Sequence, residues 1–327
     1  MSNLNLSMQN LLPFEKIKRE ILIRKEVQAD SDSENSPESR KIEEIIQYGI
    51  INMDKPQGPT SHQVSDYVQK ILNISKSGHS GTLDPNVTGV LPIALGRATR
   101  IVQALLNAGK EYIALMHIHK DVEEDKIRNC IKGFTGKIRQ LPPIKSAVKR
   151  QLRQREIYYM DILEIDGKDV LFRVGCEAGT YIRKLCHDIG CKLKTGAHMV
   201  ELRRTKAGPF DESSLATLHD LKDAYEFWKE DKDETQLRKI IQSIENAVKH
   251  LPKIWIFDSA VEPLCHGSDL KVPGISKMES GIKKDDVVAI LTLKNNLVAL
   301  GNALISSQEM FAEKGIALKT NKVFMQI

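Results

Sequence analysis

The stretch over residues 78–89 reads Gly-His-Ser-Gly-Thr-Leu-Asp-Pro-Asn-Val-Thr-Gly and gathers reactive and turn-forming residues in one short segment. Its three glycines let the backbone approach a ligand closely and adopt positive φ angles. Asp84 precedes Pro85, which biases the Asp84 backbone toward an extended or turn conformation. The stretch therefore predicts a stiff loop that presents a carboxylate, although an Asp-Pro step alone is also a common turn.

A second loop, residues 54–62, carries the pattern Lys-Pro-x-Gly-x-Thr-Ser immediately before a helix that we expect over residues 61–71. Thr60 or Ser61 is a suitable N-cap for this helix. Backbone N–H groups at the start of a helix attract phosphate, and Lys55 adds a cation nearby. The pattern is weak by itself, but it predicts a phosphate contact by Lys55.

Two more side chains that could take part in catalysis or binding lie near the starts of expected elements. Tyr112 opens an alternating strand over residues 110–119, where it could equally be a half-buried sheet residue. Arg183 falls in the first turn of a helix for which Thr180 is the expected N-cap. Because the helix dipole disfavours a cation there, Arg183 predicts an anionic partner, either in a site or in a surface salt bridge.

Between Lys126 and Arg155 the chain carries ten Lys or Arg residues and no Asp or Glu. A run of one sign repels itself unless an anion neutralises it, and a nucleic-acid backbone does so with release of counterions. A solvated basic surface is the alternative. We predict a protruding basic loop that uses Lys145, Arg150 and Arg153 to contact RNA phosphates.

The composition describes a globular protein of 327 residues with a net charge of +5, long enough for two domains. We expect a cytoplasmic protein, because the sequence shows no signal peptide and no apolar run that could span a membrane. Five scattered cysteines suit a reducing compartment. They include no C-x-x-C pair for zinc, and the chain has no phosphate-binding loop of the NTPase type.

The elements around these motifs alternate between helical and strand patterns. We expect an amphipathic helix over residues 1–27 and a flexible linker over residues 29–39. Short β-type runs recur from residue 253, with a hairpin turn at Asn295 and Asn296. The other expected elements are strands over residues 46–53, 157–163, 170–176 and 199–205, a strand-to-helix passage over 90–101, and helices over 215–229 and 234–250.

The stretch at 78–89 resembles the nucleophile loop of the TruB family of RNA pseudouridine synthases, and the Lys-Pro-x-Gly-x-Thr-Ser pattern resembles the first motif of that family. These enzymes break the N1–C1′ bond of a flipped uridine and bond C5 to C1′. The resemblance implies that Asp84 is the nucleophile and that Arg183 pairs with it. Tyr112 would stack on the base and relay the C5 proton.

The same resemblance assigns His79 to the flipped nucleotide and Leu202 to the apolar wall of the pocket. It implies no metal and no organic cofactor, because the isomerisation is redox-neutral. Residues 260–275 resemble the signature of PUA domains, which are small RNA-binding β-barrels. The residues to which this signature assigns guide-RNA binding are His266, Gly267, Leu270, Pro273 and Gly274.

The sequence over residues 146–158 and 161–167 is similar to the dyskerin-like branch of the family, which modifies RNA with the help of a guide RNA. The missing Lys-rich tail favours an archaeal member. That branch implies target RNA, an H/ACA guide RNA and three small proteins: one Gly/Arg-rich in type, one zinc-ribbon-like and one kink-turn-binding. A stand-alone tRNA synthase and a non-catalytic RNA scaffold are the alternatives. Which uridines are modified is not encoded.

These inferences give an α+β fold with a mixed, largely antiparallel sheet and an appended β-barrel. We expect an N-terminal extension and linker over residues 1–45, a TruB-like catalytic domain over 46–250, and a PUA domain over 251–327. The expected activity is the isomerisation of uridine to pseudouridine in rRNA, with uridine-55 of tRNA as a second expected target.

Overall fold

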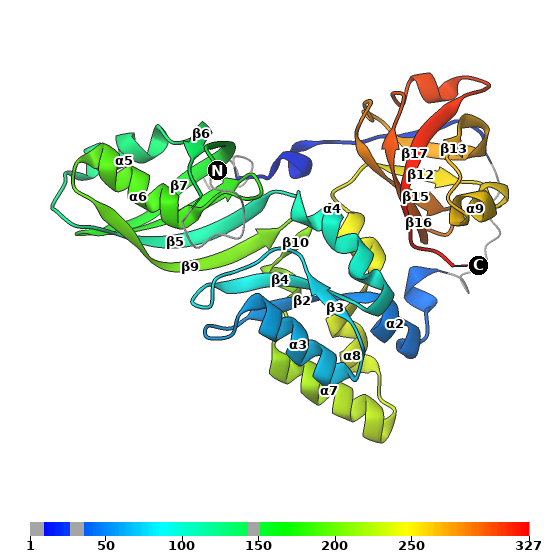
Figure 1. Cartoon of the computed structure of the whole chain (residues 1–327), viewed down its shortest axis with the longest axis horizontal. Coiled ribbons are helices and arrows are strands. Elements are labelled where there is room, and N and C mark those ends of the chain that lie inside the picture. Colours follow the sequence, from blue (N-terminus) through cyan, green and yellow to red (C-terminus); the bar gives the residue numbers. More distant parts are fainter. Residues whose placement is uncertain (1–9, 27–35, 143–150, 327) are drawn as a thin grey trace, which may run out of the picture.

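The computed structural model describes residues 10–26, 36–142 and 151–326, which form two sheets with helices packed around them (Figure 1). The larger sheet contains β2 (Gly49–Lys55), β3 (Ser77–His79), β4 (Thr88–Leu95), β5 (Lys110–Ile118), β6 (Gly136–Gln140), β7 (Arg153–Asp166), β8 (Asp169–Cys176), β9 (Ala197–Ala207), β10 (Phe210–Asp211) and β11 (Ile241–Ser243). The smaller sheet contains β1 (Ile21–Ile23), β12 (Lys253–Ile256), β13 (Leu270–Lys271), β14 (Ile275–Glu279), β15 (Val287–Thr292), β16 (Leu297–Ala303) and β17 (Ile316–Val323).

The helices are α2 (Ile42–Tyr48), α3 (Ser61–Leu72), α4 (Val102–Leu106), α5 (Glu124–Lys132), α6 (Ile182–Leu193), α7 (Leu218–Asp231), α8 (Thr235–Ile240) and α9 (Asp258–Cys265). Short 3₁₀ turns join them: η1 (Pro13–Lys16), η3 (Pro37–Ser39), η4 (Gly96–Ile101), η5 (Glu212–Ser214), η6 (Ile244–Val248), η7 (Val272–Gly274) and η8 (Glu309–Phe311).

The main path of the larger sheet runs β11-β2-β4-β9-β5-β8-β7-β6, with β3 beside β4 and β10 beside β9. Within it, β4 and β9 pair in parallel and the other described pairs are antiparallel. This confirms the predicted α+β fold with a mixed, largely antiparallel sheet. Strands β4, β9 and β5 lie side by side at its centre, so residues distant in sequence meet there.

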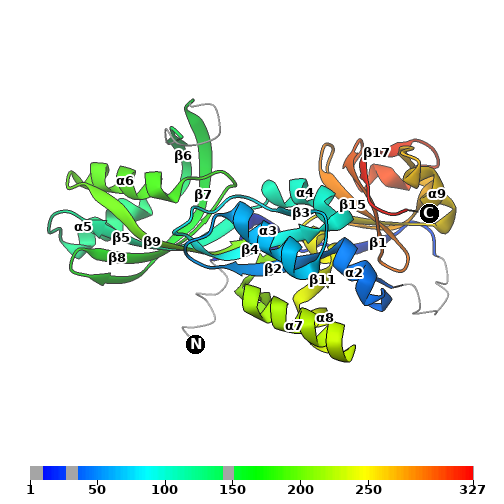
Figure 2. The ribbon, with the colours of Figure 1, turned by 60° about the horizontal axis from the view of Figure 1, so that its bottom comes forward.

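Helices cover the larger sheet in separate groups (Figures 1 and 2). The apolar faces of α5 and α6 pack on β5 and β8, and those of α2, α3, α7 and α8 pack on one face of β2 and β4. The other face of β2 and β4 shares a core cluster with η4, α4, η6, apolar residues of the smaller sheet such as Trp255, and Phe324, which follows β17. Continuous apolar packing therefore joins the two sheets.

The N-terminal segment corrects one prediction, because its described part is not an amphipathic helix. After η1, the chain runs as strand β1, which pairs antiparallel with β14 and adds an edge strand to the smaller sheet. Leu22 packs against the core of that sheet while Ile21 and Ile23 face outward. The pairing with β14 and the two β-branched residues of β1 thus outweigh the helical spacing of Ile17 and Ile21.

Other local predictions hold with shifted boundaries. Helix α3 begins at Ser61, and Thr60 forms the expected cap as part of a capping box with Gln63. Asn295 has a positive φ in the turn between β15 and β16, as predicted. Strands β5, β7, β8 and β9 and helices α6 and α7 also form near the expected positions.

Three boundaries are wrong. Residues 46–48 complete α2 rather than starting a strand, and the N-cap of α6 is Tyr181 rather than Thr180. The helix expected over residues 234–250 is interrupted by β11, because residues 241–243 pair with β2. Long-range pairing of this kind overrides local propensity.

We expect the buried imidazole of His250 to make stability depend on pH. His250 is 7% exposed, and its ring nitrogens make no well-aligned hydrogen bond within the described residues, although the Ala104 backbone lies close. Burial lowers the pKa of His250 from 6.5 to about 4. Between these values the unfolded chain binds a proton that the folded chain excludes, so the free energy of unfolding falls as pH falls.

Urea unfolding at pH 7 and pH 5 measures this effect. Wild type should lose stability over the interval, and His250→Leu should lose less because it has no such proton to bind. The exposed His219 provides a matched control, and His219→Gln should keep the wild-type loss. An equal loss in His250→Leu would contradict the prediction.

Candidate active site

The loop between β3 and β4 carries Asp84 and is fixed by apolar and polar contacts on either side of it. Leu83 and Val87 are buried, so the loop is anchored in the core just before and just after Asp84. The Leu83 N–H donates to the Ser61 hydroxyl at 2.8 Å, and that hydroxyl donates to the Leu83 carbonyl at 3.2 Å. The start of α3 therefore holds the loop by its backbone.

Lys55 completes this attachment from within. Its side chain is fully buried, and its ammonium donates to the carbonyls of Pro56 at 2.9 Å, Pro85 at 3.0 Å and Val87 at 2.8 Å. All three ammonium protons are thereby used. The predicted phosphate contact by Lys55 is therefore corrected, since Lys55 instead ties the end of β2 to the loop that presents Asp84.

Asp84 itself lies at the surface of the site and pairs with Arg183. The Arg183 guanidinium donates to the Asp84 carboxylate from the first turn of α6, and the two side chains are 59% and 54% exposed. The anionic partner expected for Arg183 is thus Asp84, although 99 residues separate the two in sequence. A guanidinium in this position orients the carboxylate and leaves it accessible to a ligand.

Tyr112 sits opposite Arg204, a residue that the sequence analysis did not select. The two are direct cross-strand partners of β5 and β9, and the Arg204 guanidinium contacts the Tyr112 hydroxyl. Burial raises the pKa of Tyr112, whereas the Arg204 charge and hydrogen bond oppose that rise. The charge of the Asp84 carboxylate adds a smaller contribution to the rise in the pKa of Tyr112.

Arg204 is 1% exposed and is held tightly. Its Nε donates to the Val90 carbonyl on β4 at 2.7 Å. Gly89, with φ of +100°, pairs with Arg204 across β4 and β9, and a Cβ at Gly89 would lie 2.2 Å from the Arg204 carbonyl oxygen. Only glycine fits that approach. The alternation Leu202-x-Arg204, which puts an arginine at a core-facing strand position, is the sequence signal that could have found it.

His79 and Leu202 occupy the surroundings of this group. His79 ends β3 immediately before the loop, is half-buried, and meets the ring of His62 edge-on at 6.5 Å between centroids. Burial lowers the pKa of His79, and His62 and Arg204 add to the effect. Leu202 is half-buried and packs against the same core cluster as Tyr112, and its place in the wall of a substrate pocket stays a prediction.

The remaining predicted RNA contacts lie elsewhere. Lys145 and Arg150 fall outside the described residues, and Arg153 begins β7 opposite Gln140 of β6. In the smaller sheet, His266, Gly267 and Pro273 are exposed and Gly274 is half-buried. Leu270 is buried in the core of that sheet, which corrects its assignment as an RNA contact.

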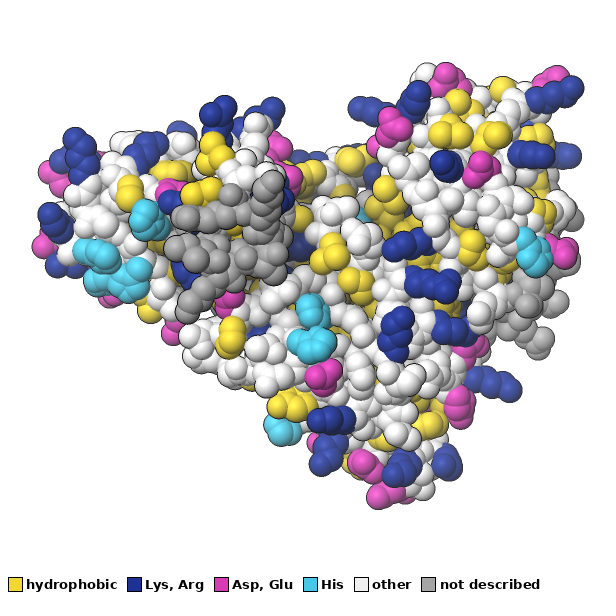
Figure 3. All heavy atoms as spheres, in the orientation of Figure 1, with side chains coloured by type: hydrophobic (Ala, Val, Ile, Leu, Met, Phe, Trp, Pro, Cys, Tyr) yellow, Lys and Arg dark blue, Asp and Glu magenta, His cyan; other side chains and the backbone are white. Residues whose placement is uncertain are grey.

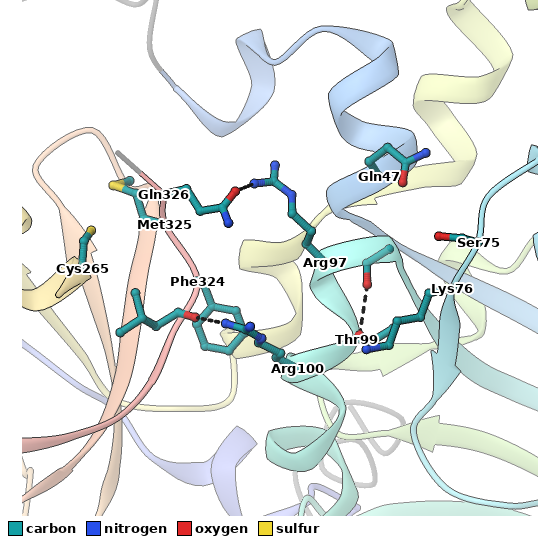
Figure 4. A pocket seen from close by; sticks show the side chains of 12 residues that line it. Gln47, Ser75, Lys76, Arg97, Thr99, Arg100, Cys265, Phe324, Met325 and Gln326 are labelled. Carbon is teal, nitrogen blue, oxygen red and sulfur yellow. Dashed lines mark hydrogen bonds between the residues drawn. The ribbon is translucent and has the colours of Figure 1, made fainter. Parts of the chain in front are cut away.

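A cavity of about 430 Å³ lies between η4 and the end of the chain after β17. Lys76, Arg97 and Arg100 line it together with polar groups, and no Asp or Glu is among its lining residues (Figure 4). Figure 3 shows Lys and Arg side chains gathered along this junction between the two sheets. The cavity is therefore positively charged.

Family models match the chain in four consecutive parts. They are the DKCLD (NUC011) domain over residues 9–65, the N-terminal domain of TruB family pseudouridylate synthases over 69–182, the tRNA pseudouridylate synthase B C-terminal domain over 183–249 and the PUA domain over 252–324. A probable tRNA pseudouridine synthase B of Pyrococcus abyssi is 61% identical over 325 residues, covering 97% of this chain and 96% of that protein. The chain belongs to the TruB family of pseudouridylate synthases.

Two solved structures place this TruB-family chain more finely. A chain in the crystal structure of a Cbf5-Nop10-Gar1 complex is 60% identical, with a TM-score of 0.92 and 97% of each chain covered. A chain in an H/ACA RNP bound to a substrate RNA containing 2′-deoxyuridine is 58% identical, with a TM-score of 0.91 and 97% and 98% covered. The similarity confirms the predicted dyskerin-like branch with a C-terminal PUA domain.

Proposed function

We propose that this chain is the catalytic subunit of an H/ACA guide ribonucleoprotein and converts uridine to pseudouridine in rRNA. The observation that carries the chemistry is the Asp84 carboxylate, which Arg183 holds on a fixed loop and which acts electrostatically on Tyr112. The observation that favours a guide RNA is the match over nearly the full length of the chains in the two complexes. A scaffold without chemistry would not need this arrangement.

In the proposed reaction the target uridine is flipped out of its stack into the site. Asp84 supplies the nucleophile that allows the N1–C1′ bond to break, and Arg183 keeps its carboxylate oriented. After the base has turned and C5 has bonded to C1′, the C5 proton must leave. Tyr112 is placed to accept this proton, and N1 takes up another, so the isomerisation is balanced without a redox partner.

We also propose that RNA follows the positive surfaces of the protein. Lys145, Arg150 and Arg153 would neutralise phosphates near the active site, and His266, Gly267, Pro273 and Gly274 would contact the guide RNA. The cavity lined by Lys76, Arg97 and Arg100 lies between the two sheets and offers cations without a competing carboxylate. Lys55 and Leu270 are left out of this set because both are buried.

The accessory proteins that we propose are counterparts of Nop10 and Gar1, which form the complex with the similar Cbf5 chain. The Gly/Arg-rich, zinc-ribbon-like and kink-turn-binding types of partner expected from the sequence stay predictions. No helix in the described parts of the chain is long and apolar enough to cross a membrane. We propose a cytoplasmic location.

A stand-alone tRNA synthase is the second candidate, because similar proteins of several archaea are described as probable tRNA pseudouridine synthase B. Tritium release from [5-³H]uridine separates the two. We would compare tRNA with protein alone against a target RNA with matched guide RNA and verified partners. We expect release in the guided reaction, and release only from bare tRNA would favour the second candidate. No release in either reaction would refute both.

A further inference from the structure

We propose that Arg204 is a positioning residue for the final proton transfer: it fixes the Tyr112 hydroxyl and stabilises the negative charge on its oxygen. The inference rests on the proposed function. Its first support is geometric, since the two residues face each other across β5 and β9 and the guanidinium contacts the hydroxyl. With Nε bound to the Val90 carbonyl and the backbone paired with Gly89, the guanidinium has little freedom to move.

The second support is an incomplete set of partners around a buried charge. Within the described residues, no Asp or Glu forms an ion pair with Arg204, and its Nη2 has no hydrogen-bond partner. A buried guanidinium without a carboxylate is costly, so a compensating anion is expected close to it. Tyr112 is in contact and can become that anion when it gives up its own proton.

Other basic groups near Arg204 increase the need for an anion beside its guanidinium. Arg204 is within electrostatic reach of His79 on β3, Lys55 on β2 and Lys110 on β5, a group of basic side chains. The groups that oppose an anion at Tyr112 are the Asp84 carboxylate and the Cys176 thiol on β8.

A nearby carboxylate is already engaged elsewhere. Glu111 accepts hydrogen bonds from Tyr159 at 2.5 Å and from Thr205 at 2.7 Å, and as the neighbour of Tyr112 in β5 it points to the opposite face of the strand. The side of the sheet that carries Tyr112 and Arg204 is therefore left without that negative charge.

Once C5 is bonded to C1′, the C5–H bond breaks and its electron pair forms the C5–C6 double bond, while the electrons of the C6–N1 double bond move to N1. The C5 proton goes to the Tyr112 phenolate, and N1 takes a proton from water. Tyr112 then releases its proton to water, which regenerates the phenolate and yields the tritium signal. Arg204 stays protonated throughout.

Removing the Arg204 charge should slow this step and leave the earlier bond changes intact. In Arg204→Gln, the guanidinium charge no longer opposes the effect of burial on Tyr112. The pKa of Tyr112 therefore rises, and less phenolate is present at neutral pH. Proton transfer by a positioned side chain contributes about 10²–10⁴-fold. We therefore expect tritium release at pH 7 to fall by about 10²-fold, and the rate to keep rising to a higher pH than in wild type.

The test uses the assembled particle with two target RNAs. One carries [5-³H]uridine, and the other carries 5-fluorouridine, which has no C5 proton to transfer. Arg204→Gln should lose tritium release but rearrange the 5-fluorouridine target at close to the wild-type rate, as should Tyr112→Phe. Arg204→Lys keeps the charge and should recover part of the tritium release, which also covers the case in which Arg204→Gln fails to fold.

Arg203→Gln is the matched control, because Arg203 lies next in β9 on the opposite face and binds Asp54 and Glu212. It should leave the ratio of the two rates unchanged. A parallel loss of both reactions in the Arg204 variants, or no loss in either, would overturn the inference while the proposed function stands. Failure of wild type on both targets would refute the proposed function itself, and the inference with it.

Discussion

Asp84→Asn should lower pseudouridine formation by at least about 10⁴-fold, because removal of a nucleophile usually costs that much or more. The fold should be unaffected. Asp84 and Arg183 form an ion pair whose side chains are about half exposed, and such surface pairs contribute at most about 1 kcal/mol to stability. Single-turnover tritium release by the assembled particle measures the rate, and thermal unfolding of the same preparations measures the stability.

The matched control is Asp121→Asn. It removes an exposed carboxylate that lies outside the loop and pairs loosely with Lys168 at 3.6 Å. It should keep the wild-type rate. If Asp84→Asn retains more than about 1% of the wild-type rate, Asp84 is not the nucleophile. Binding of target RNA, checked in parallel, should be unchanged, which separates a chemical defect from a failure to bind.

The parts of the site that could be predicted from the sequence are those specified locally. The Asp-Pro step and the glycines of residues 78–89 determine a loop by their own backbone preferences, and the Thr60 cap places the start of α3 beside it. The alternation of residues 110–119 predicted strand β5, but the role of Tyr112 followed only from the resemblance to the TruB family. Arg183 was found because a cation in the first turn of a helix asks for an anion, and that anion is Asp84.

The parts that could not be predicted depend on contacts between distant segments. The sequence of β1 is compatible with a helix, and only its pairing with β14 makes it a strand of the smaller sheet. Arg204 becomes a neighbour of Tyr112 only because β9 lies between β4 and β5. In both cases the local pattern was ambiguous and tertiary structure decided it, which is the ordinary limit of reasoning from propensity.

The buried position of Lys55 also depends on contacts between distant segments, and we expect its substitution to have a large effect. Lys55→Met should remove the donor from the carbonyls of Pro56 and Val87, whereas Pro85 keeps the Gly58 N–H at 2.9 Å. The Val87 bond is buried, and a buried carbonyl left without a partner costs about 1–3 kcal/mol, whereas the carbonyl of the exposed Pro56 can bond to water. The free energy of unfolding should therefore fall by about 1–3 kcal/mol. The freed loop should misplace Asp84 and lower the rate of tritium release by about 10²-fold.

Thermal unfolding and RNA binding at several salt concentrations distinguish this tethering role from the phosphate contact that the motif suggested. A tether predicts a lower melting temperature with an unchanged salt dependence, because a buried ammonium neutralises no phosphate. Lys70→Met on the exposed face of α3 is the control and should change neither. An unchanged melting temperature with a shallower salt dependence would instead mean that Lys55 reaches the RNA, so that the loop must open around it when substrate binds.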